Sequence, residues 1–331
     1  MIQPSQDAGS ESPAIRRSLD TIPRSPHAID PLRLVAAQPA RPSWLRSAAP
    51  SHLDTALRLT AIALLLRPMG QWFVRPAILG AAALLLISPR ALRMPAIWLA
   101  LAFAVAVRIA DDWPLADNHI YLLAYWSLAI ALSLRSAKPI ATLGFNSRVL
   151  IGFAFACAVL WKALLAPDFL DGRFFRVTLL TDPRFGEASM LIGGLTADQL
   201  QANRGALEPL PHGAALLTPP AVVEPPRLRQ LAALSTWGIL VLETTVACLM
   251  LLPSRRRVPV FRHVMLLTFC LVTYAFAPVA GFGWLLLVMG AAQTEPHERW
   301  LQRLYVIAFL IVLFYAEVPW TGLLLDFSRS S

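Results

Sequence analysis

The sequence predicts an all-α membrane protein: a polytopic transmembrane helical bundle of about eight or nine apolar segments with one external insert. Of its 331 residues, 56% are apolar and only 15% are charged, and the mean hydropathy is +0.57. A soluble domain carries about 25% charged residues. The apolar residues also fall into long runs, and the arginines gather at the ends of these runs. Both observations indicate several membrane spans rather than one water-soluble core.

Nine apolar runs define the predicted segments. A full span needs about 20 residues, so several of the runs are short. The run 280–293 is half-length and follows its predecessor through Pro278-Val-Ala-Gly281, so we expect the two to form a broken or re-entrant pair. The runs cover residues 54–68, 74–89, 94–110, 118–135, 147–165, 232–252, 259–278, 280–293 and 301–317.

The basic residues predict the orientation. The first 50 residues are polar, proline-rich and contain arginines, without the apolar stretch of a signal peptide, so we expect residues 1–50 to form a disordered cytoplasmic tail. If every run crosses, the acidic connection 111–117 falls outside, and the basic clusters between runs share the side of the tail, as the positive-inside rule requires. These clusters are Arg90 and Arg93; Arg135, Lys138 and Arg148; Arg255 to Arg257; and Arg299 and Arg303.

This arrangement divides the rest of the chain into three parts: first transmembrane helices (51–165), an external loop or insert (166–231) and C-terminal transmembrane helices (232–320). The connection 166–231 is too long for a simple loop. Within it, Thr196-Ala-Asp-Gln199 has the pattern of a capping box and predicts a short helix to about Arg204. The proline-rich stretch 209–226 is expected to be extended.

Several function classes have no support in the sequence. The net charge of +9 comes almost entirely from arginines at the ends of apolar runs, which indicates membrane topology and no nucleic-acid partner. The chain has no CxxC, HExxH, GxGxxG or P-loop motif, so we expect no metal and no nucleotide-driven transport. No internal repeat supports a transporter. Cys157, Cys248 and Cys270 lie in apolar runs and are expected to be buried, small apolar residues.

Lys162 is the first candidate site residue. It is one of only two lysines and lies at the end of the apolar run 147–165. An ionisable group at membrane depth is a functional-site hypothesis, because desolvation favours the neutral amine, a usable base or nucleophile. Two alternatives stay open: the side chain reaches to the interface, or it pairs with a carboxylate. The candidate partners for such an ion pair are Asp168, Asp171 and Glu243.

The start of the run 118–135 carries a second group, since Asn118, Tyr121 and Tyr125 share one helix face at the i, i+3, i+7 spacing. The alternative is a helix cap followed by an aromatic belt at the interface, which explains the aromatic residues well and His119 less well. The cap would come from Asp117 or Asn118, and the belt from Tyr121, Tyr125 and Trp126.

Three more polar residues need an explanation. Glu243 lies in the middle of an apolar run, so its carboxylate must be paired, protonated or turned to an interior cavity. Arg108 can pair with Asp111 or Asp112 one turn on, and His263 is expected at the interface. We expect Lys162 and His119 to be the catalytic candidates of one outer-half site. Its pocket candidates are Asp117, Asn118, Tyr121, Arg108 and Glu243.

The order of these motifs resembles a known family. The segment Asn118-His119-Ile-Tyr121-Leu, after Asp112-Trp113, is similar to the Asn-His-x-Tyr-Leu segment of the horizontally transferred transmembrane domain (HTTM) family. That family contains the membrane part of vitamin K-dependent gamma-glutamyl carboxylase, and has a lysine at the helix end where Lys162 stands. The further matches, in family order, are Asp168-Phe169-Leu170-Asp171-Gly172, Glu243, Arg255 to Arg257, His263 and Phe282-Gly283-Trp284.

The resemblance implies a role for Lys162 as the base that starts oxygenation of a reduced quinone, with Asn118, His119 and Tyr121 lining the pocket. The chain departs from the carboxylase: Ala163 replaces a second lysine, and two residues appear inserted before Asp168. It also has no large soluble C-terminal domain, so we expect no glutamate carboxylation.

Two functions remain. In the first, Lys162 binds or acts on a lipid-soluble, quinone-like molecule. In the second, the chain is a non-catalytic binding or maturation partner of an exported protein, which it contacts through the insert 166–231. For either function the arginine-rich, lysine-poor composition and the family's distribution favour a multi-pass protein of a bacterial inner membrane.

Overall fold

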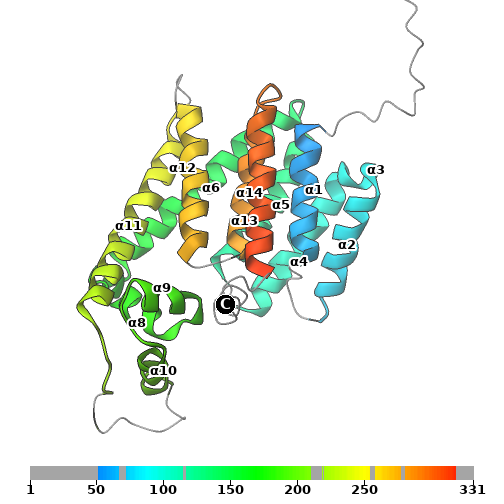
Figure 1. Ribbon diagram of the computed structural model, residues 1–331. Coiled ribbons are helices and arrows are strands. Elements are labelled where there is room, and N and C mark those ends of the chain that lie inside the picture. Colours follow the sequence, from blue (N-terminus) through cyan, green and yellow to red (C-terminus); the bar gives the residue numbers. More distant parts are fainter. Residues whose placement is uncertain are drawn as a thin grey trace, which may run out of the picture. The chain divides into compact units, whose positions relative to one another are not determined.

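All nine apolar runs form helices in the computed structural model. It describes residues 51–66, 72–114, 117–209, 218, 220–253, 258–276 and 280–317, all of which belong to one compact unit. These residues form fourteen α-helices and one short 3₁₀ helix, without a β-strand (Figure 1). The all-helical class is therefore confirmed for the described part of the chain. The predicted tail 1–50 and the basic turn 255–257 lie outside the described residues.

The helices that contain the nine runs begin close to the predicted positions. Two begin earlier, because Pro139 and Pro226 stand at their first positions, where proline favours helix initiation. The nine are α1 (His52–Leu66), α2 (Arg75–Ile87), α4 (Pro95–Asp111), α5 (Asn118–Leu134), α6 (Pro139–Leu164), α11 (Pro226–Leu251), α12 (Val258–Phe276), α13 (Ala280–Ala292) and α14 (Arg299–Glu317).

Two of these helices, α6 and α11, are long and apolar enough to cross a membrane, by length and composition. Four shorter apolar helices accompany them within the described residues: Arg75–Ile87, Asn118–Leu134, Val258–Tyr274 and Gly281–Ala292.

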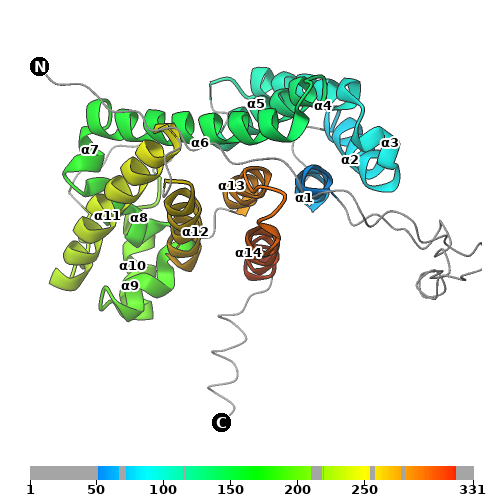
Figure 2. The same ribbon diagram turned by 90° about the horizontal axis from the view of Figure 1, so that it is seen from above.

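The half-length run forms the centre of the bundle. Helix α13 packs against α1, α6, α12 and α14 (Figure 2). Its side chains from Trp284 to Ala292 are buried around the whole helix, as expected for a helix that is apolar on every face. The close approach of its neighbours depends on glycine: the Gly283 N–H donates to Tyr274 Oη at 2.6 Å, and Tyr305 packs against Gly290.

The packing of α12 against α13 contradicts one of the two expectations for this pair, a broken helix, whereas a re-entrant pair stays a prediction because it also consists of two antiparallel helices. Gly283 lies beside Tyr274 and Gly290 beside Leu266, so α12 and α13 run antiparallel along most of their lengths. They are two separate helices rather than one interrupted helix. The physical reason is that α13 is apolar on all sides, so it is buried most fully with a neighbour on every face.

Basic residues clearly outnumber acidic residues at one end of the bundle, in the part of the chain that the structure describes, and we call it the arginine end. The hydrogen bonds that join the helix termini there are Arg93 to Asp54 (3.0 and 2.8 Å), His52 with Thr294 (3.2 Å), Gln302 to the His52 carbonyl (3.1 Å), Asn146 to Ser133 (3.2 Å) and Arg262 to the Leu249 carbonyl (2.7 Å). They bring together the starts of α1, α6, α12 and α14 and the ends of α5, α11 and α13. The basic residues predicted to share one side lie at these termini, apart from those outside the described residues.

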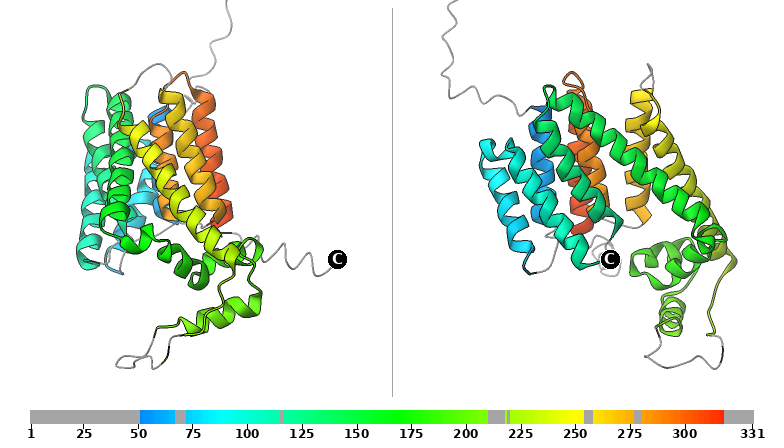
Figure 3. Two further views of the ribbon diagram at one scale, coloured as in Figure 1. Left: turned by 90° about the vertical axis from the view of Figure 1, so that its left-hand side faces the viewer. Right: turned by 180° about the vertical axis from the view of Figure 1, so that it is seen from behind.

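The opposite end carries the predicted insert, which is helical and has a small apolar core of its own (Figure 3). Its helices are α7 (Pro167–Leu170), α8 (Arg173–Thr181), η3 (Pro183–Phe185), α9 (Gly186–Leu191) and α10 (Ala197–Ala206). Its core residues are Leu179, Leu180, Phe185, Leu195 and Leu200, which pack against Leu228, Leu231 and Ala232 of α11.

The capping box that predicted α10 is confirmed. Thr196 Oγ1 accepts from the Gln199 N–H, and the Gln199 side chain accepts from the Thr196 N–H. The predicted extended stretch 209–226 is non-helical over the described residues 220–225, and α11 then begins at Pro226. The last residues of the predicted insert therefore belong to a long helix rather than to a loop.

Candidate functional site

Lys162 forms an ion pair with Glu243. The Lys162 ammonium donates to both carboxylate oxygens, at 2.5 Å to Oε2 and also to Oε1. The Lys162 side chain is 20% exposed and that of Glu243 is 8% exposed, so both charges are largely removed from solvent. The sequence leaves several alternatives open for Lys162, and the one found in the structure is the ion pair with Glu243.

The packing of α6 against α11 creates this pair. The two helices run antiparallel and approach closely at Gly152, where an added Cβ would lie 2.7 Å from Leu251 Cδ2. From that contact α6 runs toward the insert end, and Lys162 meets Glu243 within the apolar stretch of α11. Removing one partner of a buried ion pair leaves an uncompensated charge, which typically costs about 3–5 kcal/mol.

An aromatic side chain covers the lysine from the insert. The ring centroid of Phe169 lies 5.3 Å from Lys162 Nζ, within the range of a cation–π contact. Phe169 is buried and packs against Phe174 and Phe175 at centroid distances of 5.3 and 5.6 Å. Gly172, with a φ of +78°, makes the left-handed turn between α7 and α8 that this packing needs. Lys162 therefore contacts both the bundle and the insert.

The structure places His119 in a different part of the bundle from Lys162. His119 lines a small cavity of about 20 Å³, space for about one water, between α1, α5 and α13. Lys162 is not among the lining residues, which are Thr60, Ala63, Leu64, His119, Leu123, Gly281, Trp284, Leu285 and Val288. His119 Nε2 is 3.7 Å from Asp117 Oδ2.

The expected convergence of Lys162 and His119 in one pocket is therefore not what the structure has. The first half of α6 packs on α5 and α13, but its second half leaves them and reaches α7 and α11 (Figure 2). Because α6 is longer than α5 and inclined to it, residues at the same end of the two helices lie far apart. That inclination could not be derived from the apolar pattern alone.

The remaining pocket candidates are mostly at the surface. Asp117 and Asn118 are exposed, and Tyr121 is half-buried. Asp117 precedes α5 without a side-chain capping bond. Arg108 forms an ion pair with Asp112, the i+4 partner that the spacing predicts.

Only some of the residues predicted to form an aromatic belt face outward. Tyr125 is exposed, but Trp126 is fully buried, and its indole N–H donates to Thr60 Oγ1 at 3.1 Å. The position of Trp126 one residue after Tyr125 turns its ring to the opposite, inner side of α5.

Two polar residues of the arginine end, His263 and Arg262, have roles that the sequence did not predict. His263, expected at the interface, is buried and its Nδ1 lies 2.8 Å from Tyr305 Oη. Arg262 is also buried and donates to the backbone carbonyls of Leu249 and Leu252 at the end of α11. An arginine near a helix C-terminus stabilises the last carbonyls of the helix. The sequence signal was a basic residue near the start of the apolar run 259–278.

The insert holds a second charged cluster. Arg176 donates through Nε and Nη2 to the two oxygens of Glu224, at 2.5 and 2.6 Å, and Arg229 Nε donates to Glu224 Oε2 at 3.1 Å. The hydrogen bonds from Arg176 lower the pKa of the Glu224 carboxyl below its usual value. The Asn203 side chain bonds both backbone groups of Val223, at 2.8 and 2.9 Å. These contacts fasten the returning segment 222–224 to α8 and α10.

Neither cysteines nor metal ligands form a site in the described residues. Cys270 is buried as expected, but Cys157 and Cys248 are exposed on the outer faces of their helices, and all three are free thiols. The apolar runs therefore include residues that face outward as well as inward. No group of three or more His, Cys, Asp or Glu residues in the described part of the chain could hold a metal ion.

Comparisons with family models, with curated proteins and with solved structures find no match for this chain.

Proposed function

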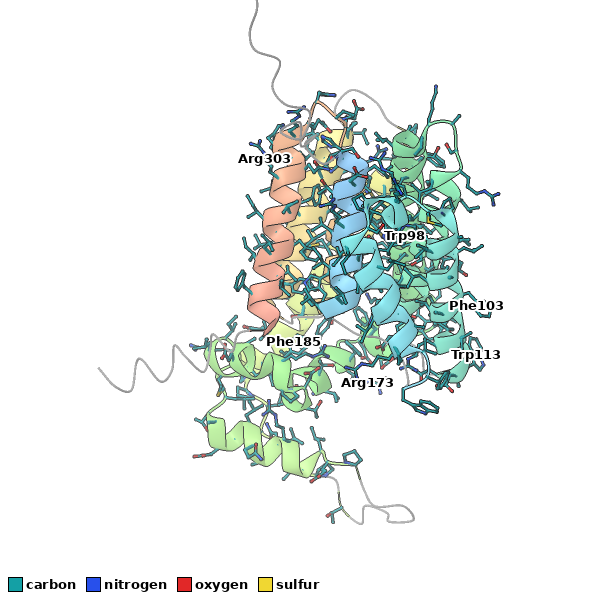
Figure 4. The ribbon with its side chains drawn as sticks, turned by 90° about the vertical axis from the view of Figure 1, so that its right-hand side faces the viewer. Trp98, Phe103, Trp113, Arg173, Phe185 and Arg303 are labelled. Atoms are coloured by element: carbon teal, nitrogen blue, oxygen red, sulfur yellow. The ribbon has the colours of Figure 1, made fainter. Side chains whose placement is uncertain are left out.

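We propose that the chain is a multi-pass membrane protein in which the nine helices of the apolar runs form the transmembrane bundle and residues 166–231 lie outside it. The outward faces of the bundle support this proposal, since they expose large apolar side chains such as Phe103, Phe153 and Leu271. Phe103 is 70% exposed and points away from the bundle (Figure 4). Soluble proteins rarely expose contiguous apolar surface on this scale, whereas lipid chains would cover it.

The charge distribution supports an orientation for this bundle. Arg303 marks the arginine end in Figure 4, and Arg173 and Phe185 mark the insert end. Residues 166–231 contain seven acidic and six basic side chains, so the insert is nearly neutral. The excess of arginine at the other end is what the positive-inside rule associates with the cytoplasm. The insert would then face the space outside a bacterial inner membrane.

For the biochemical role, we propose that the insert is a binding surface for an exported protein and that the Lys162–Glu243 pair fastens it to the bundle. The observation that carries this proposal is that Lys162 already has partners: its ammonium pairs with Glu243, and the ring of Phe169 from the insert covers it. The insert also exposes Leu191 and Ile192 at the end of α9, with Leu191 83% exposed. A partner protein would cover this apolar pair.

Photocross-linking in native membranes tests this role. A photoreactive amino acid at Leu191 should give one defined product with an exported protein, and the same amino acid at Gln201, which is exposed on α10, should not. Leu191→Asp with a neighbouring cross-linker should remove the product by placing a charge in an apolar contact. Equal products from both positions, or none from Leu191, would contradict the role.

A second candidate function rests on the same pair. Lys162 and Glu243 are an acid and a base in direct contact within apolar helices, and the resemblance to the HTTM family implies a base at Lys162 that acts on a reduced quinone. A quinone at such a site would have to reach a lysine that already contacts Glu243 and Phe169.

Incubation with reduced quinones separates the two candidates. Purified protein in lipid is mixed with menaquinol or vitamin K hydroquinone, with Lys138→Ala as control, since Lys138 is the other lysine and is exposed. A structural pair predicts no oxygenated quinone from any variant. Oxygenated product that is lost in Lys162→Ala and kept in Lys138→Ala would establish the second function instead.

A further inference from the structure

A recess at the arginine end lies between α1 and the short helix α3 (Pro89–Leu92), which are neighbours in Figure 1. Its volume is about 420 Å³, and it opens to the surface. Three arginines and one carboxylate line it. The lining residues are Asp54, Arg58, Pro89, Arg90, Leu92 and Arg93.

The charges in this recess do not balance within the described residues. Arg93 donates through Nε and Nη2 to the two oxygens of Asp54, at 3.0 and 2.8 Å, which pairs one arginine with the only acid. Arg58 and Arg90 are exposed and make no hydrogen bond or ion pair with the described part of the chain. Within the described residues both guanidinium groups lack an acceptor, and their planar N–H pairs match the oxygens of a phosphate.

Exposed apolar residues precede and follow α3 in the sequence. Ile87, in the last turn of α2 just before Pro89, is 81% exposed, and Leu84 one turn earlier is also exposed. Met94 is exposed on the other side of α3. A ligand that placed a phosphate between Arg58 and Arg90 would also meet the apolar lining residues Pro89 and Leu92. An anionic head with an apolar tail fits this surface better than a free ion does.

The depth of Arg58 agrees with such a ligand. Arg58 follows the first residue of α1, His52, by six positions, which is about 9 Å along the helix at 1.5 Å per residue. An arginine at this depth in a membrane helix reaches back to the headgroup region with its guanidinium group. Basic pockets between helices on the cytoplasmic side are suited to anionic lipid headgroups.

We propose that this recess binds the phosphate group of an anionic phospholipid of the cytoplasmic leaflet, held by Arg58 and Arg90. The proposal rests on the membrane location proposed above. Arg93, fixed by Asp54, forms the third side of the site. The same chemistry would accept a soluble phosphate monoester, so the test has to compare the two sources.

The experiment uses the full-length protein extracted from membranes in neutral detergent, titrated with phosphatidylglycerol or phosphatidylcholine and followed by native mass spectrometry. The variant Arg58→Gln/Arg90→Gln is compared with Arg299→Gln/Arg303→Gln. The control removes two exposed arginines from the same end, outside the recess, and so changes the net charge equally. Glycerol 3-phosphate is added as a soluble competitor.

The site predicts that phosphatidylglycerol binds in preference to phosphatidylcholine. Loss of Arg58 and Arg90 should weaken its binding about 30-fold, the effect of two basic residues at an anionic lipid surface. The control variant should bind like the wild type. Equal weakening in both variants, or no preference between the two lipids, would overturn the site.

Displacement of the lipid by glycerol 3-phosphate at similar concentrations would overturn the lipid assignment in favour of a soluble phosphate. A separate fractionation tests the membrane location on which the site rests. Protein released from the membrane fraction without detergent would contradict that location.

Discussion

Lys162 connects three elements through one side chain. It lies at the end of α6, its ammonium pairs with Glu243 of α11, and Phe169 of α7 covers it. The sequence identified Lys162 and Glu243 as polar residues in apolar runs, and named their pairing as one alternative. It could not select that alternative, because the two residues are far apart in the chain and their contact depends on how α6 crosses α11.

Removing only one charge of this pair should be more harmful than removing both. Lys162→Met leaves Glu243 buried without a partner, and we expect a loss of about 3–5 kcal/mol in unfolding free energy. The double variant Lys162→Met/Glu243→Met should recover most of that loss, because two apolar side chains of similar volume often replace a buried pair at little cost. Thermal unfolding in one detergent measures both.

Lys138→Met provides the control for this comparison, because Lys138 is exposed and the change should leave stability close to that of the wild type. A double variant that is less stable than either single variant would show that the pair is not merely a matter of charge balance.

Two glycines of α13 should tolerate no side chain. A Cβ at Gly283 would lie 2.0 Å from Tyr274 Oη, and one at Gly290 would lie 2.3 Å from Tyr305 Cε1. Because both tyrosines are buried and cannot move aside freely, Gly283→Ala and Gly290→Ala should each lower stability by about 1–3 kcal/mol. Gly238→Ala in α11 has nothing within 4 Å, and should instead raise stability slightly through helix propensity. Melting temperatures of the three variants that did not differ would contradict this packing.

At the scale of elements, the apolar runs predicted where helices lie but not how they cross. The apolar runs located all nine helices, because helix formation is largely a local property, but they missed the earlier starts of α6 and α11 at Pro139 and Pro226. The burial of α13 at the centre of the bundle was not predicted, because it depends on neighbours from four other helices. Within the insert, the capping box predicted α10, but α8 and α9 carry no comparable local signal.

The insert should lose stability in acid through Glu224. Hydrogen bonds from Arg176 lower the pKa of this carboxyl in the folded state. The contribution of Glu224 to the stability of the insert is therefore fully present above the pKa of this carboxyl in the unfolded chain, which is about 4.3. It is lost as the pH falls through the lower pKa of the folded state. Glu224→Gln should cost about 1 kcal/mol at pH 7, a value reduced for the exposure of Arg176, and should cost less near pH 3.

Hydrogen exchange of residues 173–181 and 220–225 measures this effect locally. Glu187→Gln is the matched control, because Glu187 makes no ion pair within the described residues. A variant that is equally destabilised at both pH values would show that the carboxylate charge contributes nothing.

At the scale of the whole molecule, the charge pattern was the most informative part of the sequence. The arginines predicted which helix termini share one end, and hydrogen bonds among those termini bring them together. The separation of Lys162 from His119 was not predictable. Both residues lie near the insert end, and they are far apart only because α6 is inclined to α5. The two ends differ in charge as a membrane orientation requires.

The central claim is that the insert and the arginine end lie on opposite sides of a membrane. The direct measurement is labelling of single cysteines in intact cells with a membrane-impermeant maleimide, after replacement of Cys157, Cys248 and Cys270. Asp198→Cys, exposed on α10, should react in intact cells, and Ala137→Cys, exposed between α5 and α6, should react only after the cells are opened. Labelling of both positions in intact cells, or of neither, would contradict the account.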